Sequence, residues 1–254
     1  MSFATTARIA LVSLGFALFA ITAPLADDGE EGFNPTQKKA VEEIVRQYLS
    51  DHPEVVLQAL QAMQEKERVA EQKKREHTLF LRRSALERDP SSPVGGNPEG
   101  DVTIVEFFDY KCGYCKRVWA SIRELLESDA DIRYVFKEFP ILGPESVAAS
   151  RAALAAWKQG PKQYMALHTA LMDNRGSLAE TKIMAIAAEA GLDVDRLRDD
   201  MNDPSVDLAL RKNYRLAQEL EISGTPAFII GDHLIPGAAD LDSLRKLVAA
   251  SRGN

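Results

Sequence analysis

Short apolar runs bounded by turn residues occur four times after residue 100, at residues 102–108, 132–139, 227–230 and 233–235. Their length and their boundaries are typical of β-strands. The last two runs flank a Gly-Asp dipeptide, which favours a tight hairpin. The sequence therefore predicts a small sheet that ends in a hairpin.

Helical spacing of apolar residues dominates the stretches between these runs. It follows the first strand to about residue 128, covers about 144–220 with breaks at Gly and Pro residues, and returns at 241–251. The order along the chain is strand, helix, strand, helical block, hairpin and helix. This order predicts an α/β fold in which a block of helices is inserted into the middle of a sheet.

Two further helices are predicted before the sheet. Helical spacing continues to about residue 51, and Pro53 starts a second helix that runs to about residue 86. An apolar seam begins at Val56 and Leu60 of this second helix, and a densely charged stretch follows it. Two interpretations stay open: a solvated helical linker, or an oligomerisation segment whose seam packs against copies of itself. We favour the second, because the seam has no other partner.

The first 26 residues have the character of a secretory signal sequence. Arg8 is the only charged residue before Asp27, and residues 9–21 are almost entirely apolar. This stretch is shorter than the about 20 residues that a membrane-spanning helix needs. We expect cleavage near Ala26, with an uncleaved anchor as the alternative.

The charge balance excludes one class of partner. Removal of residues 1–26 would leave 228 residues with a formal net charge of about −8. A chain of this charge is repelled by the phosphates of nucleic acids. We therefore predict no nucleic-acid partner.

Cys112 and Cys115 are the only cysteines among the 254 residues, and they form the sequence Cys-Gly-Tyr-Cys between a predicted strand and a predicted helix. Exported proteins usually use cysteines as structural cross-links. Two cysteines in one turn cannot link distant segments of the chain. We therefore expect the pair to have a reactive role and not a structural one. A helix N-terminus favours a thiolate at Cys112, which we expect to be exposed. Cys115, one turn further, can close a disulfide or resolve a mixed one.

Metal binding is the competing interpretation of the pair. Two thiolates can hold Cu(I) or supply half of a zinc site. The four histidines of the chain show no ligand spacing, so we predict no structural metal and no cofactor other than the redox-active cysteine pair. Weak copper binding by the reduced pair stays open as a less favoured alternative.

The residues Thr225 and Pro226 directly precede the predicted hairpin. A proline at the start of a strand lacks the N–H that a neighbouring strand would use. Pro226 can be a trans proline that ends the preceding helix, or a cis proline that presents the preceding backbone to a thiol substrate. The local pattern leaves both interpretations open.

Several of these features together resemble the DsbA family of thioredoxin-fold thiol-disulfide oxidoreductases. They are Glu106 six residues before Cys112, the Cys-x-x-Cys at a helix start, the helical insertion, and Gly-Thr-Pro before the terminal hairpin. The resemblance covers about residues 100–252. It implies a thioredoxin fold with an inserted helical subdomain. It also implies that Pro226 is cis and faces the cysteine pair, and that the backbone of Thr225 pairs with the substrate.

Two details indicate which members of this family the chain resembles most. The oxidase DsbA has Pro-His between its cysteines and Val before the cis-proline, whereas Gly113, Tyr114 and Thr225 here are similar to the pattern of the isomerases DsbC and DsbG. The helical extension at 34–88 resembles that of the ScsC (suppressor of copper sensitivity) and Com1-type branch. Some members of that branch form trimers through such a segment and act as isomerases.

The resemblance implies a function and a set of partners. We expect an exported, periplasmic thiol-disulfide oxidoreductase that leans toward isomerase or reductase activity, with a DsbA-like dithiol oxidase as the alternative. The expected partners are proteins with thiols or disulfides, a membrane redox partner, and further copies of the chain, with a trimer among the expected oligomers.

It also implies roles for individual residues. Cys112 is expected to be the attacking thiolate and Cys115 the resolving thiol. Glu106 is the candidate proton acceptor for Cys115, with an exposed position on the strand as the alternative. Tyr114 is expected to tune the thiolate or contact the substrate, and Gly113 is a supporting residue of the motif.

The predicted organisation has four parts. Residues 1–26 are the signal sequence, 27–88 the helical oligomerisation segment, and 89–99 a linker rich in Pro, Gly and Ser. Residues 100–254 form the DsbA-like thioredoxin domain, with its helical insertion at about 144–220.

Overall fold

The computed structural model describes residues 32–253. The predicted signal sequence at 1–26 lies outside these residues. Within 32–253, no helix combines the length and the apolar character needed to cross a membrane. The chain divides into two compact units, and the boundary falls between Gln61 and Ala62.

The first unit consists of helix α1 (Pro35–Asp51) and the beginning of helix α2 (Pro53–Glu87). Asn34 caps α1: its side chain accepts from the backbone N–H of Gln37, and the Gln37 side chain accepts from the backbone N–H of Asn34. This reciprocal pair satisfies donors that a helix start leaves unpaired. Both helices confirm the predicted elements. Every residue of α1 is at least partly accessible, and none is buried.

The second unit is built on a five-stranded sheet with the order β1-β3-β2-β4-β5. Its strands are β1 (Val94–Gly96), β2 (Val102–Phe108), β3 (Ile132–Glu138), β4 (Ala227–Ile230) and β5 (His233–Pro236). The central strands β2 and β3 are parallel, and all other pairs are antiparallel. The four predicted strands and the hairpin β4–β5 are confirmed.

Strand β1 corrects one expectation. It lies within 89–99, which we predicted to be a linker, and it pairs with β3 at the edge of the sheet. Three residues, two of them glycines, leave no apolar pattern to recognise. The positions of the domain boundaries themselves stay a prediction.

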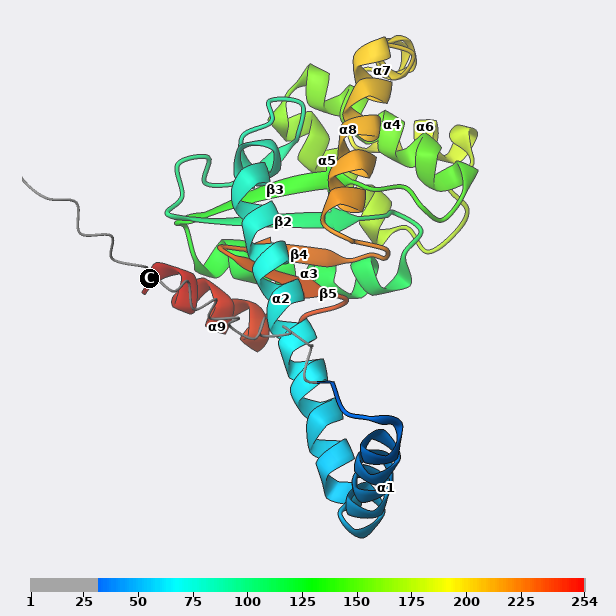
Figure 1. The fold of residues 1–254 in the computed structure, drawn as a ribbon. Helices are drawn as coiled ribbons and strands as arrows, with labels where there is room; N and C mark the ends of the chain where they lie inside the picture. The colour runs from blue at the N-terminus through cyan, green and yellow to red at the C-terminus, as the bar shows by residue number, and fades with distance from the viewer. Residues whose placement is uncertain (1–31, 254) are drawn as a thin grey trace, which may run out of the picture. The chain divides into compact units, whose positions relative to one another are not determined.

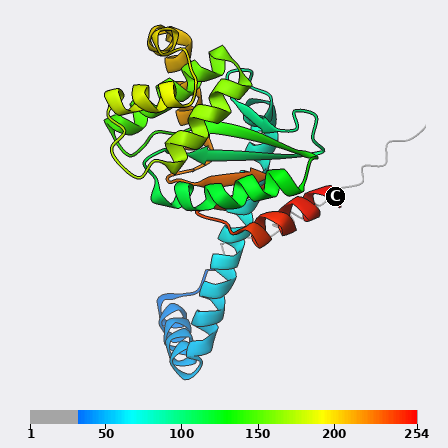
Figure 2. The ribbon, with the colours of Figure 1, turned by 180° about the vertical axis from the view of Figure 1, so that it is seen from behind.

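Side chains of β2 alternate between two faces of the sheet, as a period of two requires. Ile104 and Phe108 pack on one side with α3 (Gly113–Ser128) and α9 (Leu241–Arg252). Val105 and Phe107 pack in a separate cluster on the other side. Figures 1 and 2 show these two faces from opposite directions.

Five helices form the insertion between β3 and β4, as the spacing predicted for about 144–220. They are α4 (Pro144–Gln159), α5 (Pro161–Asp173), α6 (Glu180–Glu189), α7 (Val194–Met201) and α8 (Pro204–Glu219). Proline stands at the start of three of them, where its missing N–H has no helical partner to lose. Helix α8 returns across the sheet on the face opposite to α3 (Figure 1).

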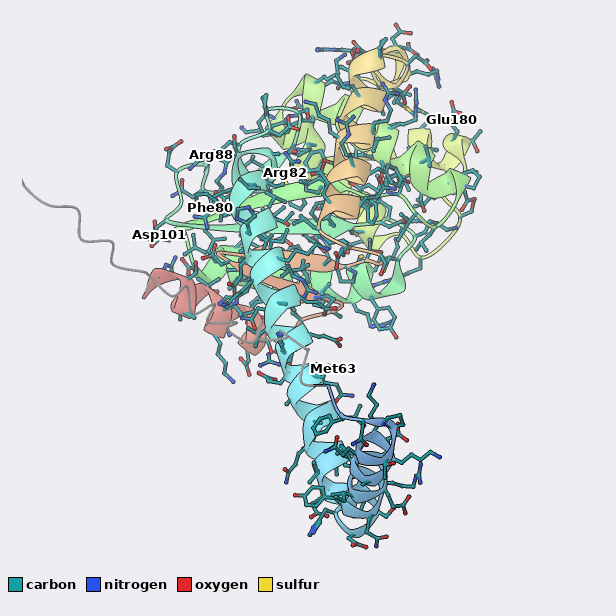
Figure 3. The ribbon with its side chains drawn as sticks, viewed as in Figure 1. Met63, Phe80, Arg82, Arg88, Asp101 and Glu180 are labelled. Carbon is teal, nitrogen blue, oxygen red and sulfur yellow. The ribbon has the colours of Figure 1, made fainter. Side chains whose placement is uncertain are left out.

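The part of α2 that belongs to the second unit is held on the same face as α8. Leu79 and Leu86 are each 2% exposed and pack in the cluster that contains Phe107. Burial of one leucine side chain stabilises a fold by about 2 kcal/mol. Arg82 reaches toward α8, where its Nε lies 2.7 Å from a carboxylate oxygen of Glu219 (Figure 3).

Candidate active site

The cysteine pair stands where β2 passes into α3. Cys112 is the N-cap residue of α3, and its backbone N–H donates to the carbonyl oxygen of Asp109 at 3.0 Å. Cys115 lies in the first turn of the helix. The strand and the helix therefore place both sulfur atoms at one end of the sheet, as the sequence predicted.

The carboxylate of Asp109 fixes the loop before the pair. It accepts from the backbone N–H of Lys111, Ile141 and Leu142 at 2.7 to 2.9 Å, and from the hydroxyl of Ser146 at 2.7 Å. Asp109 is fully buried. Sequence reasoning missed this residue, although an acidic residue between an apolar strand and the Cys-x-x-Cys motif was a signal for it.

Cys112 has the surroundings of a stabilised thiolate. Its sulfur accepts from the backbone N–H of Cys115 at 3.4 Å. The pKa of Cys112 is lowered to about 5, mainly because the Cys115 thiol donates a hydrogen bond to its sulfur. Hydrogen bonds from the Thr225 side chain and from backbone N–H groups lower this pKa further, whereas burial raises it. Such donors stabilise the charged form of a thiol.

The expected exposure of Cys112 was wrong, because the residue is only 5% exposed. The Thr225 carbonyl covers it at 3.2 Å from the sulfur and accepts from the protonated thiol. Because so little of Cys112 is accessible, a client disulfide must approach it closely along the backbone of Thr225.

Cys115 has the opposite character. It is fully buried, and its pKa is raised by burial, by the hydrogen bond that it donates to Cys112 and by the charge of Glu106. Both cysteines are free thiols in this structure. The pair therefore combines one acidic thiol with one that holds its proton.

Glu106 is buried and does not occupy the exposed position on the strand that was the alternative expectation. One carboxylate oxygen accepts from the hydroxyl of Tyr134 at 2.7 Å. The other is buried and has no hydrogen-bond partner among the described residues. Burial raises the pKa of Glu106 to about 8. A carboxyl group with this pKa can both accept and return a proton near neutral pH.

The peptide bond between Thr225 and Pro226 is cis, as the resemblance implied. Pro226 directly precedes β4, and β4 pairs with β2 beside the cysteine pair. The Thr225 carbonyl oxygen lies against Cys112. The structure thus brings together residues that are more than 100 positions apart in the chain.

Gly113 and Tyr114 lie between the two cysteines and are exposed. A side chain at Gly113 would meet only the Arg117 guanidinium, at 3.8 Å, so packing does not demand a glycine there. The Tyr114 ring is 59% exposed, and the Arg117 guanidinium stacks over it at 4.2 Å from the ring centre. Both residues border the approach to Cys112.

A second buried carboxylate near the loop was also missed by sequence reasoning. Glu138, at the end of β3, accepts from the hydroxyls of Tyr110 and Tyr164 at 3.1 Å and of Ser150 at 2.8 Å. Burial raises its pKa to about 8. The Tyr110 hydroxyl also contacts Nδ1 of the buried His168 at 2.9 Å. The hydroxyl groups that bind Glu138 come from the loop after β2, from α4 and from α5, so no local sequence pattern indicates this cluster.

The arrangement suits thiol-disulfide exchange. One thiol ionises at neutral pH, its neighbour stays protonated, and a buried carboxyl group lies on the same face of the sheet as the pair. Among residues 32–253, no group of three or more His, Cys, Asp or Glu side chains is placed to hold a metal ion.

Comparisons with protein families match both parts of the chain. Residues 103–249 match the family described as DSBA-like thioredoxin domain. Residues 37–70 match the family described as copper resistance protein ScsC N-terminal domain.

Solved structures with similar folds come from several bacteria. A thioredoxin-like oxidoreductase from Silicibacter pomeroyi DSS-3 is 46% identical, with a TM-score of 0.66, over 68% of this chain and 98% of its own. A linker-deletion mutant of Proteus mirabilis ScsC is 30% identical, with a TM-score of 0.66, over 88% of this chain and 99% of its own. BcfH of Salmonella enterica Typhimurium is 30% identical, with a TM-score of 0.70, over 86% of this chain and 97% of its own.

Curated relatives match over a shorter stretch. Na(+)/H(+) antiporter NhaA 1 of Salinispora arenicola is 30% identical over 160 residues, which are 62% of this chain and 24% of the antiporter. Disulfide bond formation protein D of Bacillus subtilis is 24% identical over 166 residues, which are 61% of this chain and 75% of that protein. The chain spans about a quarter of the length of the curated relatives that it matches first.

Proposed function

Because the chain belongs to the family of DSBA-like thioredoxin domains, a family of thiol-disulfide oxidoreductases, we propose that it rearranges disulfides in exported proteins through Cys112. The observation that carries this proposal is the asymmetry of the pair. The pKa of Cys112 is lowered to about 5, while that of the buried Cys115 is raised. An acidic thiol is both a good nucleophile at neutral pH and a good leaving group.

The reaction begins at the sulfur of Cys112. Its thiolate attacks one sulfur of a client disulfide, forms a mixed disulfide, and the second client sulfur leaves as a thiolate. In isomerisation, another client thiolate attacks the client sulfur of the mixed disulfide. A new client disulfide forms, Cys112 leaves as a thiolate, and no electrons are transferred overall.

Net reduction takes a different second step. Cys115 transfers its proton to Glu106 and attacks the sulfur of Cys112 in the mixed disulfide. The Cys112–Cys115 disulfide forms, and the client leaves with two thiols, so the pair has supplied two electrons. The raised pKa of Glu106, about 8, makes this carboxylate a stronger base than an exposed one. A further round requires a redox partner that reduces the pair, and we assign this role to a membrane protein.

The helical segment before the sheet supports the proposal of an oligomer. Large apolar side chains that are 37–67% exposed follow helical spacing along α1 and the start of α2. They are Val41, Ile44, Val45, Tyr48, Leu49, Val56, Leu57, Leu60 and Met63. An apolar face of this size needs a partner in water. We propose that copies of the chain cover it, with a trimer as the form that the ScsC resemblance implies.

An oligomer favours isomerisation over net oxidation. Several Cys112 sites held around one misfolded client act at a high effective concentration, because the second encounter is intramolecular. A monomeric oxidase would need no such segment. The proposed location is the periplasm, the compartment printed for the Salmonella thioredoxin-like relative, which is 34% identical.

The experiment compares two reactions in the full chain and in a seam variant. Wild type is expected to reactivate scrambled ribonuclease. Leu60→Glu, which buries a charge in the proposed seam, is expected to be monomeric by light scattering and to lose most of this activity. Its reaction with a small disulfide should stay within about twofold of wild type, because exposed positions rarely affect folding. Gln58→Glu, at an exposed polar position of the same helix, is the matched control.

Two outcomes would overturn parts of this proposal. Equal isomerase activity in an oligomeric wild type and a monomeric Leu60→Glu variant would remove the helical segment from the mechanism. Rapid oxidation of reduced ribonuclease without reactivation of the scrambled form would establish the dithiol oxidase instead.

A further inference from the structure

A hollow of about 250 Å³ adjoins the loop that carries Thr225 and Pro226. Residues 221–227 line one side of it, and residues of β5 and the following turn line another. The Thr225 carbonyl oxygen is 3.2 Å from the sulfur of Cys112. Since Thr225 borders both the sulfur and the hollow, a client chain that lies along this loop reaches the hollow within a few residues of its reactive cysteine.

One wall of the hollow comes from a distant part of the chain, the side chain of Arg75 on α2. Arg75 and Leu234 also line a second hollow, of about 280 Å³, together with the acidic residues Glu71, Glu76 and Asp232. Arg75 therefore borders both of these hollows, and it also lines a smaller one together with Glu219 and Glu221.

Helix periodicity explains why Arg75 faces the sheet. Leu79 lies four residues later, so it shares a face of α2 with Arg75. Leu79 is 2% exposed and packs in the cluster beneath α2. Lys74, the neighbour of Arg75, pairs with Glu221 at 2.7 Å. These contacts belong to the compact unit that begins at Ala62, so the position of Arg75 beside the loop is built into that unit.

The guanidinium of Arg75 has unused binding capacity. Among the described residues it makes no ion pair within 4.0 Å and no side-chain hydrogen bond. The pKa of Glu221, the acidic residue of the hollow, is lowered mainly by its hydrogen bond from Lys74 and only to a smaller extent by the charge of Arg75. An arginine offers five N–H donors in a planar fork that matches a carboxylate. The remainder of the lining is mainly backbone and apolar groups, including Ile222, Pro226 and Ala227. Such a lining suits an extended polypeptide.

We propose that Arg75 is a specificity-determining residue that binds a client carboxylate, an Asp or Glu side chain close in sequence to the client cysteine. The inference rests on the proposed function, because it concerns the clients of Cys112. It gives the C-terminal half of α2 a part in client selection besides its attachment to the sheet.

The test uses the full chain and three disulfide-containing peptides that differ at one residue beside the cysteine, with Asp, Asn or Lys. The second-order rate constant of mixed-disulfide formation with Cys112 is measured for each. Wild type is expected to prefer the Asp peptide. Arg75→Ala is expected to lower the rate constant for the Asp peptide by about tenfold, as loss of one charge-assisted hydrogen bond predicts. The Asn peptide should change by less than about twofold.

Two further variants sharpen the result. Arg75→Glu is expected to invert the preference toward the Lys peptide, and added salt should weaken the wild-type preference. Lys73→Ala removes the same charge from an exposed neighbouring position that lines neither hollow, and it should behave as wild type.

Equal effects of Arg75→Ala on all three peptides, no effect on any, or the same effect from Lys73→Ala would overturn the inference. Failure of the proposed function has a different signature. In that case wild type reacts with none of the peptides, or reacts equally after Cys112→Ala.

Discussion

Glu106 is the residue whose burial matters most for the second half of the reaction. One of its oxygens is bonded to Tyr134, and the other is buried without a partner. With a pKa of about 8 it is mainly protonated at neutral pH, and a minor ionised fraction can accept a proton. The group is therefore suited to exchange a proton with Cys115.

Glu106→Gln separates the two halves of the reaction. We expect attack by Cys112 to keep its rate and resolution by Cys115 to slow by about 100-fold, the lower end of what general acid–base catalysis contributes. Stopped-flow measurement of mixed-disulfide formation and decay distinguishes the two steps. Equal slowing of both steps would show that Glu106 acts only through the fold.

The same variant has an effect on stability with a definite sign. The folded pKa of Glu106 lies above its unfolded value, so its contribution to stability is fully present below about pH 4.5 and is lost as the pH rises through about 8. Glu106→Gln should therefore gain stability relative to wild type above pH 8. Urea unfolding at several pH values measures this difference, and a constant difference across the range would contradict it.

Cys112 contributes with the opposite sign. Its folded pKa of about 5 lies below the ordinary thiol value, so its stabilisation of the reduced protein is present above about pH 8.5 and is lost as the pH falls through about 5. The free energy of unfolding of the reduced form, minus that of the disulfide form, should rise between these pH values. Reduced Cys112→Ser is the control, and it should lack this rise.

At the scale of elements, the loop between β2 and α3 depends on Asp109. Its carboxylate is the acceptor for four donors that belong to the loop before Cys112 and to the segment after β3. A buried donor left without an acceptor costs about 1–3 kcal/mol.

Asp109→Ala should therefore destabilise the domain by at least about 3 kcal/mol and disturb the position of Cys112. Urea unfolding measures the loss of stability. The rate at which Cys112 is alkylated, at a pH where wild type is folded, reports the changed position of Cys112. Asp232→Asn, at an exposed acidic position near the hairpin, is the control and should change neither. A loss below about 1 kcal/mol would contradict this account of the loop.

Most helices and strands could be predicted from local sequence patterns, and one strand could not. The helices from 144 to 220, the strands β2 and β3, and the hairpin were predicted because prolines and glycines mark their ends and apolar residues fill their faces. The parallel pairing of β2 with β3 was not predicted. Strand β1 was not predicted, because it owes its place to pairing with β3 and not to its own composition.

Some residues of the candidate site could also be predicted from the sequence, and others could not. The cysteine pair and Glu106 were recognised from spacing within one strand and one turn. Asp109, Glu138 and Arg75 were not, because distant parts of the chain make up their surroundings. Ile141 lies 32 residues from Asp109, Tyr164 lies 26 residues from Glu138, and Arg75 meets the loop at 221–227 only through the fold. Which buried carboxylate meets which donor depends on tertiary packing, and a single sequence does not report that.

At the scale of the whole molecule, the chain consists of two compact units. The unit from Ala62 onward contains the sheet, both cysteines and Arg75. The helices before it bury no apolar face of their own. We expect Leu60→Glu to leave the free energy of unfolding of the sheet-containing unit unchanged within about 0.5 kcal/mol. A larger loss, measured by urea unfolding at one protein concentration, would mean that this unit depends on the helical segment.

Covalent trapping tests most directly whether Cys112 attacks client disulfides. Cys115→Ala removes the resolving thiol and leaves only the return of client thiols to release the mixed disulfide. We expect this variant, incubated with scrambled ribonuclease, to accumulate an adduct that peptide mass spectrometry locates at Cys112. Absence of an adduct, or an equal yield through Cys115 in Cys112→Ala, would contradict the claim.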